Sequence, residues 1–252
     1  MRKSFLAAVL PVLMLFMTSC HVSFHFPPET SSGSGSIPEQ LTAEDFVLHN
    51  PYGLEYIMIS ENGEDVPYYV ISTDYDGNVL LLRKEVLPEP MPYSYEEAIY
   101  NTGVTYYPGS AVDQYLSDEF PGRLSDGLSA DLAVSDVPVY TIDSVRGAGD
   151  MQIETIPRSI FVLSGSEVGL NVYHQIRDGE TVDNIEEINA EELNWTRTSY
   201  FLEDDVRVFV NSNESYGGEG VSECHYIRPA ITIPSGMNVI EDNGVYRLEC
   251  ER

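Results

Sequence analysis

Two cysteines late in the chain are the side chains that could take part in the most kinds of chemistry. Cys224 and Cys250 stand 26 positions apart. In an exported protein they can form a disulfide, and closing that loop would contribute about 3 kcal/mol through chain entropy. Two inert thiols, and a redox or copper site, are the alternatives that this spacing leaves open. The pair is therefore a candidate disulfide first and a candidate reactive site second.

The sequence lacks the common catalytic patterns. It contains no Gly-x-Ser-x-Gly elbow, phosphate-binding loop, dinucleotide fingerprint or His-Glu-x-x-His motif. His49, His174 and His225 are scattered, and none stands at metal-ligand spacing from another. The acidic runs 203–205 and 211–214 are typical of a solvated surface rather than an ion site. We therefore expect no enzyme, no cofactor and no metal site.

The charge balance excludes one class of partner. Lys and Arg total 13 against 41 Asp and Glu, which gives a formal net charge of −28. Such a chain repels phosphate backbones over about 8 Å at physiological salt. Hydrophobic residues make up 42% of the chain, which is enough for a folded core. We expect neither nucleic-acid binding nor wholesale disorder.

The N-terminus has the pattern of a targeting signal. Arg2 and Lys3 precede an almost unbroken apolar run, Leu6–Met17. This run is too short to span about 30 Å of hydrocarbon, which takes about 20 residues, but it suits the core of a signal peptide. We predict a signal peptide over residues 1–19.

The signal ends in Met17-Thr18-Ser19-Cys20, which resembles the bacterial lipobox. That motif implies cleavage before Cys20, lipidation of this cysteine, and anchoring through the attached acyl chains. A plain secretory signal cleaved near Ser19 is the alternative. The lipobox predicts a lipoprotein on the extracytoplasmic face of the cell membrane, with the membrane as its partner.

A polar tether is expected to follow the anchor. Pro27-Pro28 and the Ser/Gly-rich stretch 31–36 have no hydrophobic period and should stay solvated. We therefore divide the mature chain into a lipidated cysteine with a flexible tether, 20–45, and one globular domain, 46–252.

Strands joined by tight turns are predicted at the start of this domain. Leu54–Ile59, Val66–Ile71 and Val79–Leu82 are apolar runs separated by Asn62-Gly63 and Asp76-Gly77. Asn-Gly and Asp-Gly dipeptides supply the positive φ angles that two-residue hairpin turns require.

Helical spacing appears later. Ser110–Phe120 places apolar residues on one face behind a capping serine, while 137–145 and 160–163 have strand character. Ser164–Glu167 has the capping-box form that precedes a helix. Together these patterns predict an α+β fold, a single mixed domain of antiparallel strands with two or three short helices.

Separated blocks carry a family resemblance. They are Tyr106–Phe120, Ile160–Val168, Asn194–Ser199 and Tyr226–Ile231. In this order they resemble the bacterial family called domain of unknown function 6273, whose members share an "FLLSxxE" step, a "WLRS" strand and a terminal "VRPA" strand. This chain departs from the pattern at Ser117, where the family has Asn, and at Thr196, where it has Leu.

The resemblance implies properties beyond those that the residues themselves give. The family is similar in its Trp-Arg-Ser and Arg-Pro strands to C-type-lectin-like domains, including the FISUMP surface modules and the formylglycine-generating enzymes. It implies a C-type-lectin-like fold in a secreted or surface-anchored protein, and it carries no activity by itself.

Three residues in these blocks are expected to be structural. Trp195 should be buried with its indole N–H bonded internally. Arg197 and Arg228 lie among apolar residues of their strands. Each is expected to pair with a carboxylate across the sheet rather than to hold a ligand.

These observations predict a noncovalent binding module for a protein or glycan. The candidate contact surface is the loop containing Asn211, Asn213 and Tyr216, since loops on a rigid scaffold usually carry recognition. A surface oxidase of the formylglycine-generating type, using Cys224 and Cys250, is one alternative. A structural or assembly protein of the cell envelope is the other.

Overall fold

A computed structural model describes residues 37–97, 99, 102–148, 150–170, 177–200 and 207–251, all within one unit, Gly33–Arg252. The predicted signal peptide, 1–19, the predicted lipidation site, Cys20, and the first part of the predicted tether, through residue 36, lie outside the described residues. Within those ranges, no helix combines the length and the apolar character that crossing a membrane requires.

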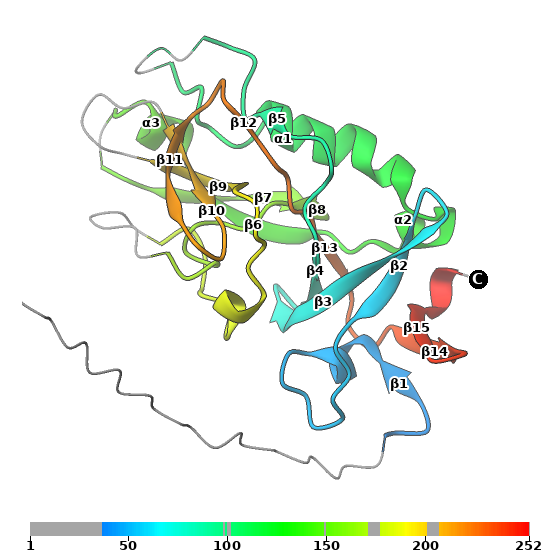
Figure 1. The fold of residues 1–252 in the computed structure, drawn as a ribbon. Coiled ribbons are helices and arrows are strands. Elements are labelled where there is room, and N and C mark those ends of the chain that lie inside the picture. The colour runs from blue at the N-terminus through cyan, green and yellow to red at the C-terminus, as the bar shows by residue number, and fades with distance from the viewer. Residues whose placement is uncertain are drawn as a thin grey trace, which may run out of the picture. The chain divides into compact units, whose positions relative to one another are not determined.

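Antiparallel strands dominate the fold (Figure 1). They are β1 (Leu41–Thr42), β2 (Ile57–Glu61), β3 (Glu64–Tyr75), β4 (Asn78–Arg83), β5 (Met91–Pro92), β6 (Ser135–Tyr140), β7 (Ile153–Arg158), β8 (Ile160–Phe161), β9 (Asn194–Tyr200), β10 (Arg207–Asn211), β11 (Tyr216–Gly220), β12 (Cys224–His225), β13 (Ala230–Pro234), β14 (Asn238–Asp242) and β15 (Val245–Leu248). In the described part of the chain they form sheets of order β1-β14-β15-β2-β3-β4-β13-β8, β11-β10-β9, β12-β5 and β6-β7. The pairing of β15 with β2 is parallel.

The helices are short. They are α1 (Ala111–Gln114), α2 (Asp126–Asp131), α3 (Ile142–Val145), η1 (Ala43–Phe46), η2 (Tyr115–Glu119), η3 (Phe120–Arg123), η4 (Ile185–Ile188) and η5 (Glu249–Glu251). The mixture of extended antiparallel sheets and short helices confirms the predicted α+β class.

The predicted hairpin turns are present. Asn62 and Gly63 have φ angles of 53° and 81°, and Asp76 and Gly77 have 52° and 77°. Each pair lies between strands whose last and first residues face one another, so both are two-residue turns with positive φ throughout. They set the pairing at the turn ends of β2, β3 and β4, and the β3–β4 register then shifts between Val70 and Ser72 and between Ser72 and Tyr75.

The core is centred on strands covered on both faces. β4 lies between β3 and β13, and its residues Val79 to Leu82 are at most 1% exposed. A continuous apolar run is the pattern of a strand with no solvent-facing side. The same cluster takes in Val112, Leu116 and Phe120, the predicted face of the helical segment.

Ser110 begins that helical segment as predicted. Its hydroxyl accepts a hydrogen bond from the Asp113 amide at 3.1 Å, and Gly109 N donates to Asp113 Oδ2 at 2.8 Å. These bonds satisfy amide groups that the first helical turn leaves without partners. After α1 the backbone widens into the π-helical turn η2 without losing its buried face.

Two helix and strand predictions were wrong in detail. The strand expected over 137–145 ends at Tyr140, because Thr141 accepts from Ser144 N and starts α3. The helix expected after Ser164–Glu167 is only a turn, which ends at Gly169. The capping hydrogen bonds form nonetheless, with Ser164 N to Glu167 Oε2 at 2.8 Å.

The folded unit starts earlier than the predicted boundary at residue 46. Leu41 pairs with Val239 in the large sheet, and Ala43 and Phe46 are fully buried. Residues 41–45, assigned to the tether from their sequence, therefore belong to the domain. A strand of two residues is too short to leave a periodic signal.

Candidate binding groove

The loop predicted as a contact surface is only partly available. Tyr216 is 64% exposed at the start of β11, and Asn213 is exposed. Asn211 is buried in β10, where its Nδ2 donates to Asn189 Oδ1 at 3.0 Å and its carbonyl accepts from Asn194. The prediction that Asn211 contacts a ligand was wrong, because its side chain holds the loop base together.

Trp195 and Arg197 occupy structural positions, as predicted. Trp195 is 1% exposed, and its indole N–H donates to the Met91 carbonyl at 2.8 Å. Arg197 is 1% exposed and pairs with the carboxylate of Glu167. Both side chains come from β9.

Arg228 differs from the prediction. Its guanidinium donates to the carbonyl oxygens of Arg83 at 2.8 Å and Lys84 at 2.9 Å, and no ion pair joins it to a carboxylate among the described residues. Burial without that compensation lowers the pKa of Arg228 to about 10. The chain leaving β4 supplies carbonyls where a carboxylate was expected.

The two late cysteines are not joined in a disulfide. Cys224 is exposed on β12, which pairs with β5, whereas Cys250 is half-buried in η5 with its Sγ 3.9 Å from Met237 Sδ. Figure 1 shows β12 and the C-terminal segment well apart. Each cysteine is held by a different part of the fold, so the structure contradicts the predicted disulfide and gives the oxidase alternative no paired thiols.

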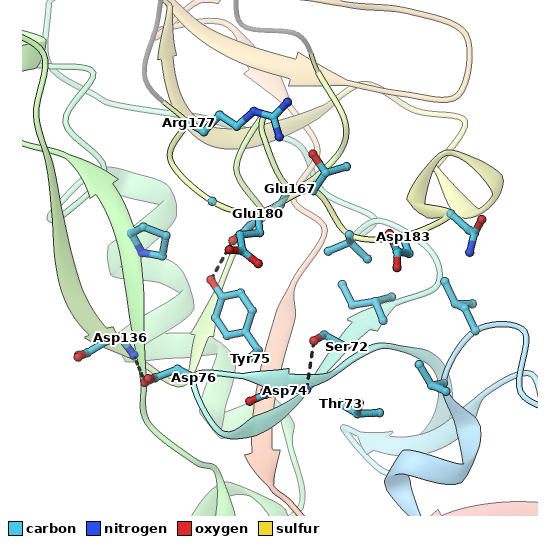
Figure 2. Close-up of a pocket in the computed structure, with 18 residues that line it drawn as sticks. Ser72, Thr73, Asp74, Tyr75, Asp76, Asp136, Glu167, Arg177, Glu180 and Asp183 are labelled. Carbon is cyan, nitrogen blue, oxygen red and sulfur yellow. Dashed lines mark hydrogen bonds between the residues drawn. The ribbon is translucent and has the colours of Figure 1, made fainter.

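A groove of about 1040 Å³ lies instead where β3, β6 and the segment 177–184 converge (Figure 2). Tyr75 projects into it from the end of β3, with its ring stacked on Phe161 at 5.5 Å between centroids. The tyrosine hydroxyl donates to Glu167 Oε1 at 2.9 Å. The floor of the groove is therefore fixed by packing and by a hydrogen bond before any ligand arrives.

Arg197 supports this floor from beneath. Its guanidinium nitrogens contact Glu167 Oε2 at 2.6 Å and Oε1 at 2.5 Å, which is the bidentate geometry that suits a carboxylate. The remaining N–H groups donate to the carbonyls of Pro138, Val162 and Asp178. One buried side chain thus ties together strand β6, the end of β8 and the segment that forms one wall of the groove.

Asp178 completes the buried polar network. Its carboxylate accepts hydrogen bonds from the hydroxyls of Ser166 and Thr198. Burial raises the pKa of Asp178, and the nearby Arg197 charge and these two hydrogen bonds oppose the rise. Burial, followed by the Glu167 charge, raises the pKa of Tyr75, so its hydroxyl stays protonated and keeps donating.

The walls of the groove are strongly acidic. The exposed lining carboxylates are Asp74, Asp76, Asp136, Glu180 and Asp183. Figure 2 shows them around Tyr75. One exposed cation, Arg177, accompanies them, and no ion pair between described residues neutralises any of the five. The site can therefore attract positive charge.

Local sequence patterns gave no warning of this groove. Glu167 was visible as part of a capping box, but its partner Arg197 is 30 positions away. Glu180 and Asp183 belong to none of the motifs found in the sequence. Their place in the groove depends on the return of segment 177–184 to β3, which no local spacing encodes.

A second group of side chains was also missed. One ligand atom from each of Glu219, Glu223 and His225 lies within 4.8 Å of the others. The three stand within seven positions of one another, so their spacing in the sequence was a signal for this cluster. Burial lowers the pKa of His225, and the two glutamates oppose that shift.

Comparison with known proteins identifies a family for most of this domain. Residues 76–235 match the family described as domain of unknown function 6273. Neither the curated proteins nor the solved structures yielded a match. The matched range contains Glu167, Asp178 and Arg197 and covers more than half of the chain. The protein therefore belongs to the DUF6273 family.

Proposed function

We propose that this protein is a lipid-anchored extracytoplasmic module that binds a cationic protein segment without covalent chemistry. Anchoring rests on the basic start, the apolar run Leu6–Met17 and the lipobox-like ending at Cys20. A signal peptide followed by a lipidated cysteine would leave the folded domain outside the cytoplasm, joined to the membrane by acyl chains.

Binding is favoured over catalysis by the composition of the groove. Its described lining contains neither histidine nor cysteine, and the hydroxyls of Ser72 and Thr181 bond to backbone groups, the Asp74 amide and the Ser166 carbonyl, rather than to a carboxylate base. A nucleophile normally needs such a base within hydrogen-bond reach. A rigid floor with polar walls instead suits recognition, because little ordering entropy is lost when the ligand binds.

The single observation that indicates the class of ligand is the excess negative charge of the groove walls. Five exposed carboxylates face one arginine, and the Glu167 charge beneath them is already paired with Arg197. An extended segment rich in Lys and Arg would gain from each of these charges, whereas a neutral glycan would gain from none. Electrostatic attraction of this kind also raises the association rate and weakens with salt.

The fold relationship implied by the sequence blocks enters here as part of the proposal. We propose that this family has a C-type-lectin-like fold, which is supported by the mixed α+β architecture and by the pairing of the early strand β1 with the late strand β14. The proposal assigns no lectin activity, because function belongs to the site and not to the fold.

The test is a binding panel with the full chain. Three probes are titrated and followed by fluorescence anisotropy: an unstructured peptide of alternating Lys and Ser, the same peptide with Glu in place of Lys, and a neutral oligosaccharide. We expect saturable binding of the Lys peptide that weakens as NaCl is raised. Preferential binding of the oligosaccharide, or equal binding of the two peptides, would overturn the proposed ligand class.

A further inference from the structure

A histidine and two glutamates meet at the end of the β10–β11 hairpin, away from the residues that line the groove. Glu219 lies in β11, Glu223 follows in the turn, and His225 lies in β12. Their ligand atoms are all within 4.8 Å of one another. Two carboxylates and an imidazole are donors that bind zinc and similar divalent ions in proteins.

The backbone fixes two of these three residues. Glu219 pairs with Val208 in the hairpin, and His225 pairs with Met91 of β5. The turn between them is closed by a hydrogen bond from Glu223 N to Gly220 O at 3.0 Å. Glu223 itself is exposed and can adjust. Such a set has two anchored donors and one adaptable donor.

The imidazole ring is held in place by packing. It packs against the indole of Trp195 in a T-shaped arrangement, with 4.7 Å between centroids and 87° between planes. His225 Nε2 is buried and has no hydrogen-bond partner among the described residues. A buried polar atom without a partner costs about 1–3 kcal/mol, so it calls for a physical explanation. The folded protein does not use this nitrogen to stabilise itself.

We propose that Glu219, Glu223 and His225 form a binding site for one divalent transition-metal ion of the Zn²⁺ class. Neighbouring ligand atoms around a tetrahedral zinc ion are roughly 3.3 Å apart for bonds of about 2.0–2.1 Å. The three ligand atoms lie within 4.8 Å of one another, and Glu223 is exposed, so its side chain can rotate toward an ion held by the other two. The imidazole disfavours Ca²⁺ and Mg²⁺, which take oxygen ligands.

Such an ion would join three segments. It would connect β11 to the turn and to β12, and through β12 to β5. Since binding to the folded state alone stabilises a protein, the ion should raise the melting temperature. The site is separate from the acidic groove, because none of its three residues lines that groove.

The test is a titration of the chelator-treated full chain with Zn²⁺ by calorimetry, with Co²⁺ as a spectroscopic probe. We expect one saturable ion per chain, visible Co²⁺ d–d absorption, and weaker binding of Ca²⁺ and Mg²⁺. Glu223→Gln, an exposed change that leaves the fold intact, should weaken Zn²⁺ binding at least about tenfold, because even loss of an outer partner costs 10–100-fold. His225→Gln should do the same.

Two control variants make the result specific. Glu214→Gln removes an exposed charge from the same hairpin, and Cys224→Ser removes the neighbouring thiol; neither should alter the affinity. Absence of saturable Zn²⁺ binding would overturn the proposal. So would binding that survives both Glu223→Gln and His225→Gln, binding lost in Cys224→Ser, or a preference for Ca²⁺.

Discussion

Arg197 and Glu167 form a bidentate ion pair that is closed off from solvent, with 0% and 1% of their side chains exposed. The pair joins β9 to the turn that follows β8, and Tyr75 adds a hydrogen bond to the same carboxylate. Both side chains are shielded from solvent, so water cannot compensate the remaining charge when one partner is removed. The pair therefore holds the groove floor in place, and loss of either member would leave a buried charge without its partner.

Breaking this pair should destabilise the domain strongly. Glu167→Gln leaves the Arg197 charge buried without its partner, and removal of one member of a buried pair costs about 3–5 kcal/mol. Urea unfolding followed by circular dichroism measures the change. The exposed pair between Arg247 and Asp65 is the control, because Asp65→Asn should cost less than about 1 kcal/mol. Equal effects of the two substitutions would contradict the assigned role of Glu167.

A glycine beside the pair should not tolerate a side chain. A Cβ added at Gly179 would stand 2.7 Å from Glu167 Cγ and 2.9 Å from Ser164 Oγ, and Arg197 prevents Glu167 from moving away. Gly179→Ala is therefore expected to cost about 1–3 kcal/mol of unfolding free energy. At Gly217 an added Cβ meets nothing within 4 Å, so Gly217→Ala should change stability by less than about 0.5 kcal/mol. Both are measured by urea unfolding, and a Gly179→Ala protein as stable as the control would contradict this packing.

The buried carboxyl of Asp178 should give a pH dependence of definite sign. Burial raises its pKa above the ordinary value of 3.8. The folded state then holds the proton more tightly than the unfolded state, so this contribution to stability is complete below about pH 3.8 and is lost as pH rises through the folded pKa. Carbon-detected NMR titration of the carboxyl measures the shift directly.

A variant separates the causes of that shift. Thr198→Val removes a hydrogen bond that favours the charged carboxylate, so it should raise the pKa of Asp178 further. Asp65 provides the opposite case, because its hydrogen bond from Arg247 lowers its pKa. A measured pKa for Asp178 below 3.8 would show that its hydrogen bonds and the Arg197 charge outweigh burial.

Local signals in the sequence predicted much of the fold. Asn62-Gly63 and Asp76-Gly77 specified their turns because the positive φ angles that each turn needs depend only on the two residues that form it. Ser110 specified a helix start for the same local reason. The α+β class and the family followed from such elements and from the blocks between 106 and 231.

Contacts between distant segments were predicted less well. Arg197 and Arg228 look alike in sequence, yet one meets a carboxylate and the other meets carbonyls, because different segments return to them. From the sequence, Asn211 is predicted to lie on the surface. In the structure, β9 and the segment ending at Ala190 pack against it. The groove also depends on a contact between distant segments, because 177–184 must lie against β3. The spacing of residues along one strand does not predict such a contact.

Lipidation at Cys20 has a direct test. Cells that express the full chain are labelled with radioactive palmitate, and the protein is recovered from membrane and soluble fractions. Cys20→Ala should abolish both labelling and membrane association, because the acyl chains provide the anchor. Cys224→Ala, which removes an exposed thiol of the folded domain, should change neither. Identical behaviour of the Cys20→Ala and unmodified proteins would rule out the lipid anchor.

The most direct measurement of the central claim is the affinity of the groove for a cationic peptide after two of its charges are removed. Glu180→Gln combined with Asp183→Asn should weaken binding of the Lys peptide about three- to thirtyfold at low salt, since each exposed charge pair contributes about 0.3–1 kcal/mol. Glu214→Gln combined with Glu241→Gln removes the same net charge elsewhere and should leave the affinity unchanged. Equal affinities for the two double variants would contradict the claim that this groove binds the ligand.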